Sequence, residues 1–169
     1  WCGKWTNSEL YLIDRIKRLG LDFIEIPLMC LETFDAEAIK KRLISVELGA
    51  VTSTVLLGDT DITSEDPHIR SNGVDYLLKC VKATHDIGAK SFSGVIYSRH
   101  VKSLNQRPDR KMWEHSADCL RQVALYAYDL GVTIGLEPVN RYETCLINTC
   151  EQALALKEMI GEDNVGIHL

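Results

Sequence analysis

Several features that mark particular protein classes are missing from this 169-residue chain. No apolar run approaches the ~20 residues that a membrane span requires. Basic residues are not in excess, because 19 lysines and arginines face 24 aspartates and glutamates, and the net charge is -5. An acidic chain is a poor partner for the phosphates of nucleic acid. With only 4 prolines and 11 glycines, low-complexity and collagen-like chains are excluded as well. We expect neither a membrane nor a nucleic-acid partner.

Paired cysteines and a secretory signal are also missing. The 6 cysteines are unevenly spaced and include no CxxC pair, which favours reduced, mostly buried thiols over a disulfide framework or a zinc site. The opening residues WCGKW contain neither a basic segment nor an apolar core. These features favour a cytoplasmic protein. Because the chain does not begin with Met, either its start was processed or it is a piece of something longer.

Glycine-rich phosphate loops are absent, but glycine recurs at a regular junction. Neither GxGxxG nor GxxxxGK[ST] occurs. Instead, an aliphatic residue followed by Gly repeatedly closes a segment of helical spacing and precedes a short apolar run, because Gly ends helices without a Cβ penalty. The pattern predicts helices over residues 8–19, 36–48, 69–87, 107–130 and 148–160 and strands over residues 22–28, 51–57, 90–97, 133–140 and 165–169.

These units predict an α/β fold with parallel strands. An open doubly wound sheet and a (β/α)₈ TIM barrel both fit, and the missing glycine-rich loops count against the open sheet. A barrel needs eight strands over about 250 residues. Including a stub of a first strand near Trp1–Trp5, about six strands fit here. We therefore predict a single domain over residues 1–169 that is an incomplete TIM barrel, with the chain truncated.

Chemistry in such a barrel belongs at the carboxyl ends of the strands. Glu137 ends an otherwise apolar strand, where an unpaired buried carboxylate costs several kcal/mol. Either a metal ion or an ion pair with Arg141 would resolve that cost, and both alternatives stay open. Because strand residues alternate in direction, we expect Glu137 to face the barrel mouth and Leu136 to pack against the helices.

Other candidates are less specific. His100 follows the strand at 90–97 and could line the mouth, whereas His168 inside the last strand could be a packed, hydrogen-bonded side chain. The direction of Glu25 is not decided by the sequence. Trp1 and Trp5 could form either an aromatic wall for a ligand or ordinary packing.

The segment EPVNRYE at residues 137–143, followed by Asn148-Thr149 and by NVGIHL at residues 164–169, resembles the ketose 3-epimerases. This D-tagatose/D-psicose 3-epimerase group belongs to the sugar isomerases and epimerases with xylose-isomerase-like barrels. The segment SEDP at residues 64–67 resembles the same group, and the similarity runs along the whole chain.

The resemblance implies an isomerase of carbohydrate metabolism that epimerises C3 of a ketose through a cis-enediolate. It implies a divalent metal, Mn²⁺ or Co²⁺ with Mg²⁺ as a further candidate, held by Glu, Asp, His and Glu. By position, Glu137 is the first metal ligand and one of two catalytic glutamates, and Glu143 binds substrate hydroxyls. The other ligands would follow Leu169, so we expect this chain alone to be almost inactive.

We further expect Trp1, Trp5, Val95 and His100 to contact the sugar substrate at a common mouth. The alternatives are a hydroxypyruvate-isomerase-like enzyme, against which NRYE argues, an inosose-processing enzyme, and an inactive fragment or sugar-binding scaffold. The sequence leaves open which sugar is used, whether it is phosphorylated, and whether the protein is a monomer or a homo-oligomer.

Overall fold

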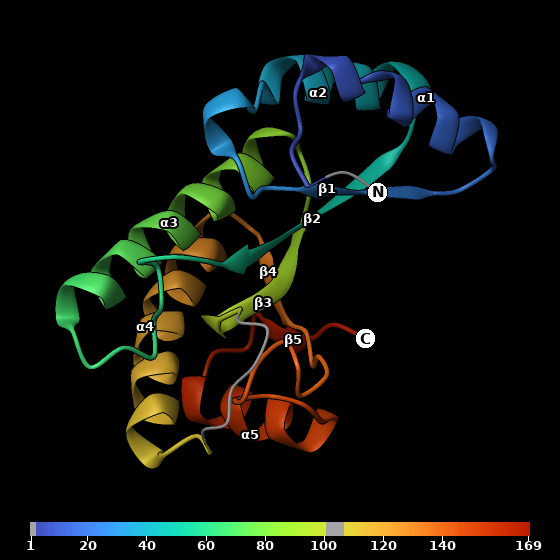
Figure 1. The fold of residues 1–169 in the computed structure, drawn as a ribbon. Coiled ribbons are helices and arrows are strands. Elements are labelled where there is room, and N and C mark those ends of the chain that lie inside the picture. Colours follow the sequence, from blue (N-terminus) through green and yellow to red (C-terminus); the bar gives the residue numbers. More distant parts are fainter. Residues whose placement is uncertain (1–2, 101–106) are drawn as a thin grey trace.

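Five parallel strands form one sheet whose spatial order follows the chain (Figure 1). The computed structural model describes residues 3–100 and 107–169. Each strand pairs with the next one in the sequence, as in a βα barrel. The strands are β1 (Phe23–Pro27), β2 (Gly49–Leu56), β3 (Ser91–Arg99), β4 (Thr133–Leu136) and β5 (Val165–Ile167).

The helices between the strands all lie on the same side of the sheet, which we call its outer face (Figure 1). The five predicted helices are confirmed, with ends that differ by a few residues. They are α1 (Tyr11–Arg18), α2 (Ala36–Val46), α3 (Pro67–Asp86), α4 (Arg110–Asp129) and α5 (Cys150–Ile160), and the two short 3₁₀ turns are η1 (Asn7–Glu9) and η2 (Leu31–Thr33). No helix in the described ranges is long and apolar enough to cross a membrane.

Local chemistry explains where these helices start and stop. At the starts of α2, α3, α4 and α5, backbone N–H groups donate hydrogen bonds to the side-chain oxygens of Asp35, Asp66, Asp109 and Thr149, respectively. Gly161 ends α5 with a positive φ of 76°, as the repeated junction predicts. At the end of α2, however, the left-handed residue is Glu47, with φ 53°.

The expected first strand is not found in the described part of the chain. Trp5 instead precedes η1, where Thr6 forms a capping box with Glu9, and five strands are described rather than six. The predicted strand 133–140 also ends early, at Leu136. Pro138 contributes to that ending because its nitrogen carries no proton for a strand pairing.

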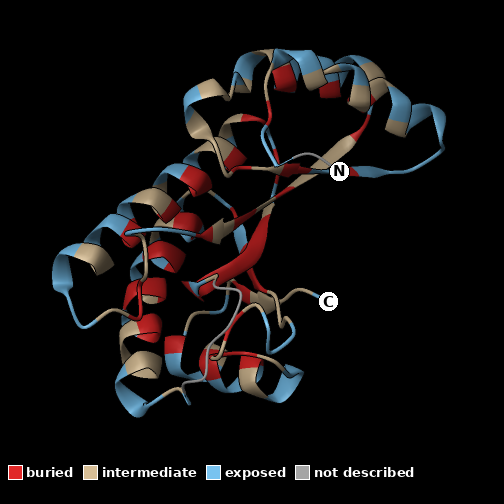
Figure 2. Ribbon diagram, viewed as in Figure 1, coloured by how far each residue is buried: buried red, intermediate tan, exposed pale blue. Residues whose placement is uncertain are grey.

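Buried residues lie along the strands and on the sides of the helices that face them, so the core lies between the sheet and the helices (Figure 2). In β1, Ile24 and Ile26 are buried beside Ile13 and Ile39, whereas Phe23 is 62% exposed on the opposite face. We call that opposite face the inner face. A larger cluster under α3, α4 and α5 contains Leu136 and Val165.

The five cysteines in the described residues are free thiols, as predicted, but they are not mostly buried. Cys80 and Cys119 lie in the core, Cys30 and Cys145 are partly exposed, and Cys150 is exposed. Cys2 lies outside the described residues.

Candidate functional site

Glu137 follows β4 and faces the inner side of the sheet. Leu136 before it is fully buried in the helix-side core, so the alternation of side chains turns Glu137 the other way. The Glu137 amide donates to the carbonyl oxygen of Gly94 at 3.2 Å, which continues the β3–β4 pairing by one residue. A partly buried carboxylate therefore stands at the carboxyl end of a central strand.

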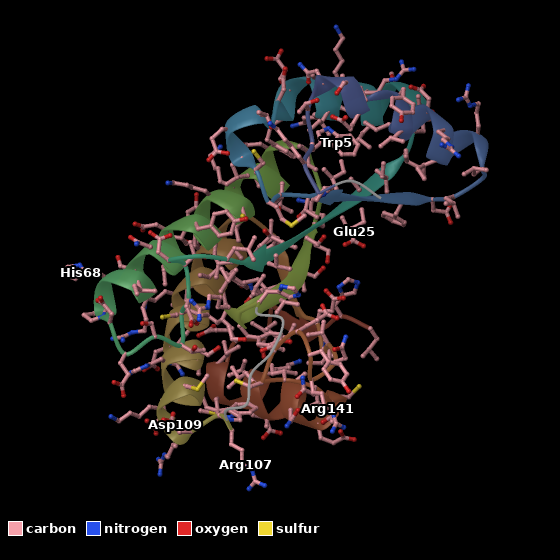
Figure 3. All side chains as sticks on the ribbon, in the orientation of Figure 1. Trp5, Glu25, His68, Arg107, Asp109 and Arg141 are labelled. Carbon is pink, nitrogen blue, oxygen red and sulfur yellow. The ribbon has the colours of Figure 1, made fainter. Side chains whose placement is uncertain are left out.

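The carboxylate of Glu137 has no hydrogen bond or salt bridge among residues 3–100 and 107–169. Arg141 is exposed on the following loop (Figure 3) and is not paired with it, so the ion-pair alternative is not what the structure shows. Burial raises the pKa of the Glu137 carboxyl above its ordinary value; His168 lowers it, and Glu25 and Glu143 raise it. These three side chains are thus titratable neighbours of Glu137.

His168 follows β5, the strand that pairs with β4 on the side away from β3, and it is a neighbour of Glu137. Its amide donates to the Leu136 carbonyl oxygen at 2.9 Å. Its ring Nδ1 is buried without a hydrogen-bond partner in the described chain, so the reading as a fully hydrogen-bonded histidine does not hold for this atom. Gly135 makes room for it, because a Cβ on Gly135 would lie 3.2 Å from the His168 Cβ.

Glu143 is held by residues from two segments. His100 Nε2 lies 3.1 Å from Glu143 Oε2, and the side-chain amide of Asn140 donates to Oε1 of the same carboxylate. The Tyr142 amide in turn donates to Asn140 Oδ1 at 2.9 Å. Two of the residues singled out from the sequence, Glu143 and His100, are therefore in direct contact.

The loop that carries both glutamates is anchored to the end of β3 by buried side chains. The Tyr97 hydroxyl donates to the main-chain oxygens of Glu137 and Ile147, at 2.9 and 3.1 Å. The hydroxyls of Ser98 and Thr144 lie 2.7 Å apart. The sequence analysis missed Tyr97 and Ser98, because nothing in an apolar strand sequence marks a hydroxyl that bonds to a segment 40 residues away.

Other predicted contact residues are placed differently. Trp5 is 1% exposed and packs in the smaller core with Ile13 and Ile26, so its assignment to an aromatic wall is wrong. Figure 3 shows Trp5 on the helix side of β1 and Glu25 on the other side. Val95 is 2% exposed, which leaves it almost no free surface. Trp1 lies outside the described residues.

Glu137 could supply part of a metal-binding site. No group of three His, Cys, Asp or Glu side chains in the described segments is placed to hold a metal ion. The unpaired, partly buried carboxylate of Glu137 is nevertheless a fitting oxygen ligand for Mn²⁺ or Mg²⁺. The described residues thus offer one position of such a coordination shell.

A family model described as a xylose isomerase-like TIM barrel matches residues 13–169. Among curated relatives, a ketose 3-epimerase of Arthrobacter globiformis is 36% identical over 170 residues, covering 100% of this chain and 58% of the relative. An L-ribulose 3-epimerase of Mesorhizobium japonicum is 35% identical over 170 residues, covering 100% and 57%.

Solved structures show the same similarity. A D-allulose 3-epimerase from Methylomonas sp., in complex with D-allulose, superposes with a TM-score of 0.94 at 33% identity and covers 100% of this chain and 59% of that one. The chain therefore spans less than two thirds of the length of these relatives.

Proposed function

Because the chain belongs to the xylose isomerase-like TIM barrel family, we propose that it supplies part of the active site of a metal-dependent ketose 3-epimerase. The observation that carries this proposal is the Glu137 side chain, a partly buried carboxylate that has no hydrogen-bond or ion-pair partner among the described residues and lies at the carboxyl end of a barrel strand. The sequence similarity to ketose and L-ribulose 3-epimerases supports the choice of reaction.

Glu137 would remove or return the proton on C3 of the ketose. A carboxylate suits this task when no internal partner holds its charge. Inversion at C3 requires a second acid on the opposite side of the carbon, because one base that returns its proton to the same side produces no epimer. We expect this second group in the part of the relatives' length that the chain does not span.

Glu137 would also hold the divalent metal, Mn²⁺ or Co²⁺, with Mg²⁺ as a further candidate. When bound, the metal would supply a Lewis acid that stabilises the negative charge of the enediolate oxygens. Because the described residues offer one such ligand, the 169-residue chain alone should bind metal weakly and show little turnover.

Glu143 would bind the sugar. His100 and Asn140 orient its carboxylate, which can then accept charge-assisted hydrogen bonds from substrate hydroxyls. His100, beside it, would border the same sugar. Trp1 and Val95 stay proposed apolar contacts, although Val95 would need its surroundings to open.

A small ketose is therefore the proposed partner, while the identity of the sugar and the formation of a homo-oligomer stay open. We place the protein in the cytoplasm, where thiols such as those of Cys80 and Cys119 stay reduced.

Solvent exchange at C3 tests this function. The protein expressed from its complete reading frame is incubated in D₂O with Mn²⁺ and with D-allulose or L-ribulose, and deuterium at C3 is followed by NMR. We expect exchange by the wild type. Glu137→Gln should abolish it and lower the metal content, because an amide is neutral and accepts no proton.

The matched control is Glu158→Gln on the exposed surface of α5, which removes the same charge away from the site and should leave exchange unchanged. Near-normal exchange and metal content in Glu137→Gln would contradict the assignment.

A further inference from the structure

Tyr97 is a buried phenol whose hydroxyl reaches the main chain of Glu137. Its side chain is 0% exposed, and its ring packs in the larger core. The single hydroxyl proton is shared between the carbonyl oxygens of Glu137, at 2.9 Å, and Ile147, at 3.1 Å. One side chain thus connects the end of β4 with the end of the loop that follows it.

The peptide groups on both sides of the Glu137 Cα are bonded to β3. On the amino side, its N–H donates to the Gly94 carbonyl oxygen at 3.2 Å. On the carboxyl side, its C=O accepts from Tyr97. Fixing both peptide groups fixes the direction in which the side chain leaves the backbone. The strand ladder alone cannot do this, because β4 ends at Leu136.

Glu143 is held by a separate set of contacts. His100 and Asn140 hold its carboxylate, and the hydroxyls of Ser98 and Thr144 hold the loop near it. The Asn148 side chain donates to the carbonyl oxygens of Val139 and Thr144, both at 2.9 Å. None of these bonds involves the Tyr97 hydroxyl, whose second bond reaches the loop at Ile147. Its loss should therefore affect Glu137, to which it bonds directly, more than Glu143.

We propose that Tyr97 is a positioning residue for Glu137: its hydroxyl holds the Glu137 carbonyl and so aims the Glu137 carboxylate at the metal and at C3 of the sugar. This inference rests on the proposed function of Glu137. Tyr97 touches neither substrate nor metal in this role and acts only through the backbone of Glu137.

The test compares Tyr97→Phe with Tyr76→Phe in the protein expressed from its complete reading frame. Tyr76 is a matched control because its phenol also donates to a main-chain carbonyl at a strand end, that of Leu28 at 3.1 Å, and bonds to Thr54 at 2.6 Å. Both variants keep the ring and lose one hydroxyl, so a general loss of stability affects both.

Two readouts are measured for each variant: the affinity for Mn²⁺ without sugar, by electron paramagnetic resonance, and the separate kcat and KM for the ketose. Outer contacts that orient metal ligands typically contribute about 10–100-fold to metal affinity or activity. We expect losses of this size in Mn²⁺ affinity and kcat for Tyr97→Phe, with KM little changed because Glu143 stays in place. Tyr76→Phe should resemble the wild type.

The outcomes separate the two proposals. If the wild type epimerises the ketose and Tyr97→Phe matches Tyr76→Phe in Mn²⁺ affinity and kcat, the role of Tyr97 is refuted and the proposed function stands. A change in KM alone would refute it too. A folded wild-type protein that neither binds Mn²⁺ nor exchanges the C3 proton overturns both.

Discussion

A methyl group added at Gly135 should strain the site more than the same group added one strand away. The Cβ of Gly135→Ala would lie 2.9 Å from the Ser93 Cβ and 3.2 Å from the His168 Cβ. Both neighbours are Cβ atoms, which cannot move without their backbones. Gly166 is the register partner of Gly135 on β5; among the described residues, its added Cβ would meet only the Ile134 carbonyl oxygen, at an ordinary 3.9 Å.

The expected magnitudes follow from these distances. Overpacking in a close-packed interior costs about 1–3 kcal/mol, while replacing Gly by Ala where the backbone allows it stabilises by about 0.4–1 kcal/mol through the unfolded chain. Gly135→Ala should therefore lower the free energy of unfolding by about 1–2 kcal/mol. Gly166→Ala should leave it unchanged or raise it slightly.

Urea denaturation of the protein from its complete reading frame measures the difference. With a denaturant slope of about 1–3 kcal/mol per molar urea, the midpoints of the two variants should differ by about 1 M. A Ser93→Gly background removes the shorter contact. In that background, Gly135→Ala should lower the free energy of unfolding by less than it does in the wild type. Equal midpoints for the two alanine variants would refute the reasoning, because the packing of Ser93, Gly135 and His168 would then not be as described.

Two further predictions concern the backbone and the helix caps. Gly94→Ala should be far more damaging than Gly135→Ala, because Gly94 has φ 122° and an added Cβ would lie 2.1 Å from the Thr54 carbonyl oxygen; loss of soluble, cooperatively unfolding protein checks this, and a wild-type melting temperature would contradict it. Asp35→Ala should lower the melting temperature at pH 7, because the Ala38 amide and the Asn7 side chain hold the pKa of the Asp35 carboxyl below 3.8. Because the pKa is lower in the folded than in the unfolded state, the ionised carboxyl stabilises the folded protein above the unfolded-state pKa, and this stabilisation is lost as the pH falls through the folded-state pKa. The difference in melting temperature should therefore shrink in acid; a difference independent of pH would contradict this origin.

The order of helices and strands, and the position of Glu137 at a strand end, could be predicted from the sequence alone. These features depend on neighbours along the chain. Apolar spacing marks the helix faces, and side chains such as Asp35 and Asp109 cap helix starts from within the same turn. Within residues 133–137, successive side chains point to opposite faces of the sheet. This period of two does not depend on the rest of the fold, so it was enough to assign Leu136 and Glu137 to opposite faces.

Which of the candidate residues contact one another could be seen only in the folded structure. Trp5 lies in a stub too short for alternation to assign its face, and it packs under the helices. The contact between His100 and Glu143 spans 43 residues, and that between Tyr97 and Glu137 spans 40. Such pairs depend on the register between strands and on the path of a loop. Both are set by packing across the whole sheet, and no local pattern in the sequence records them.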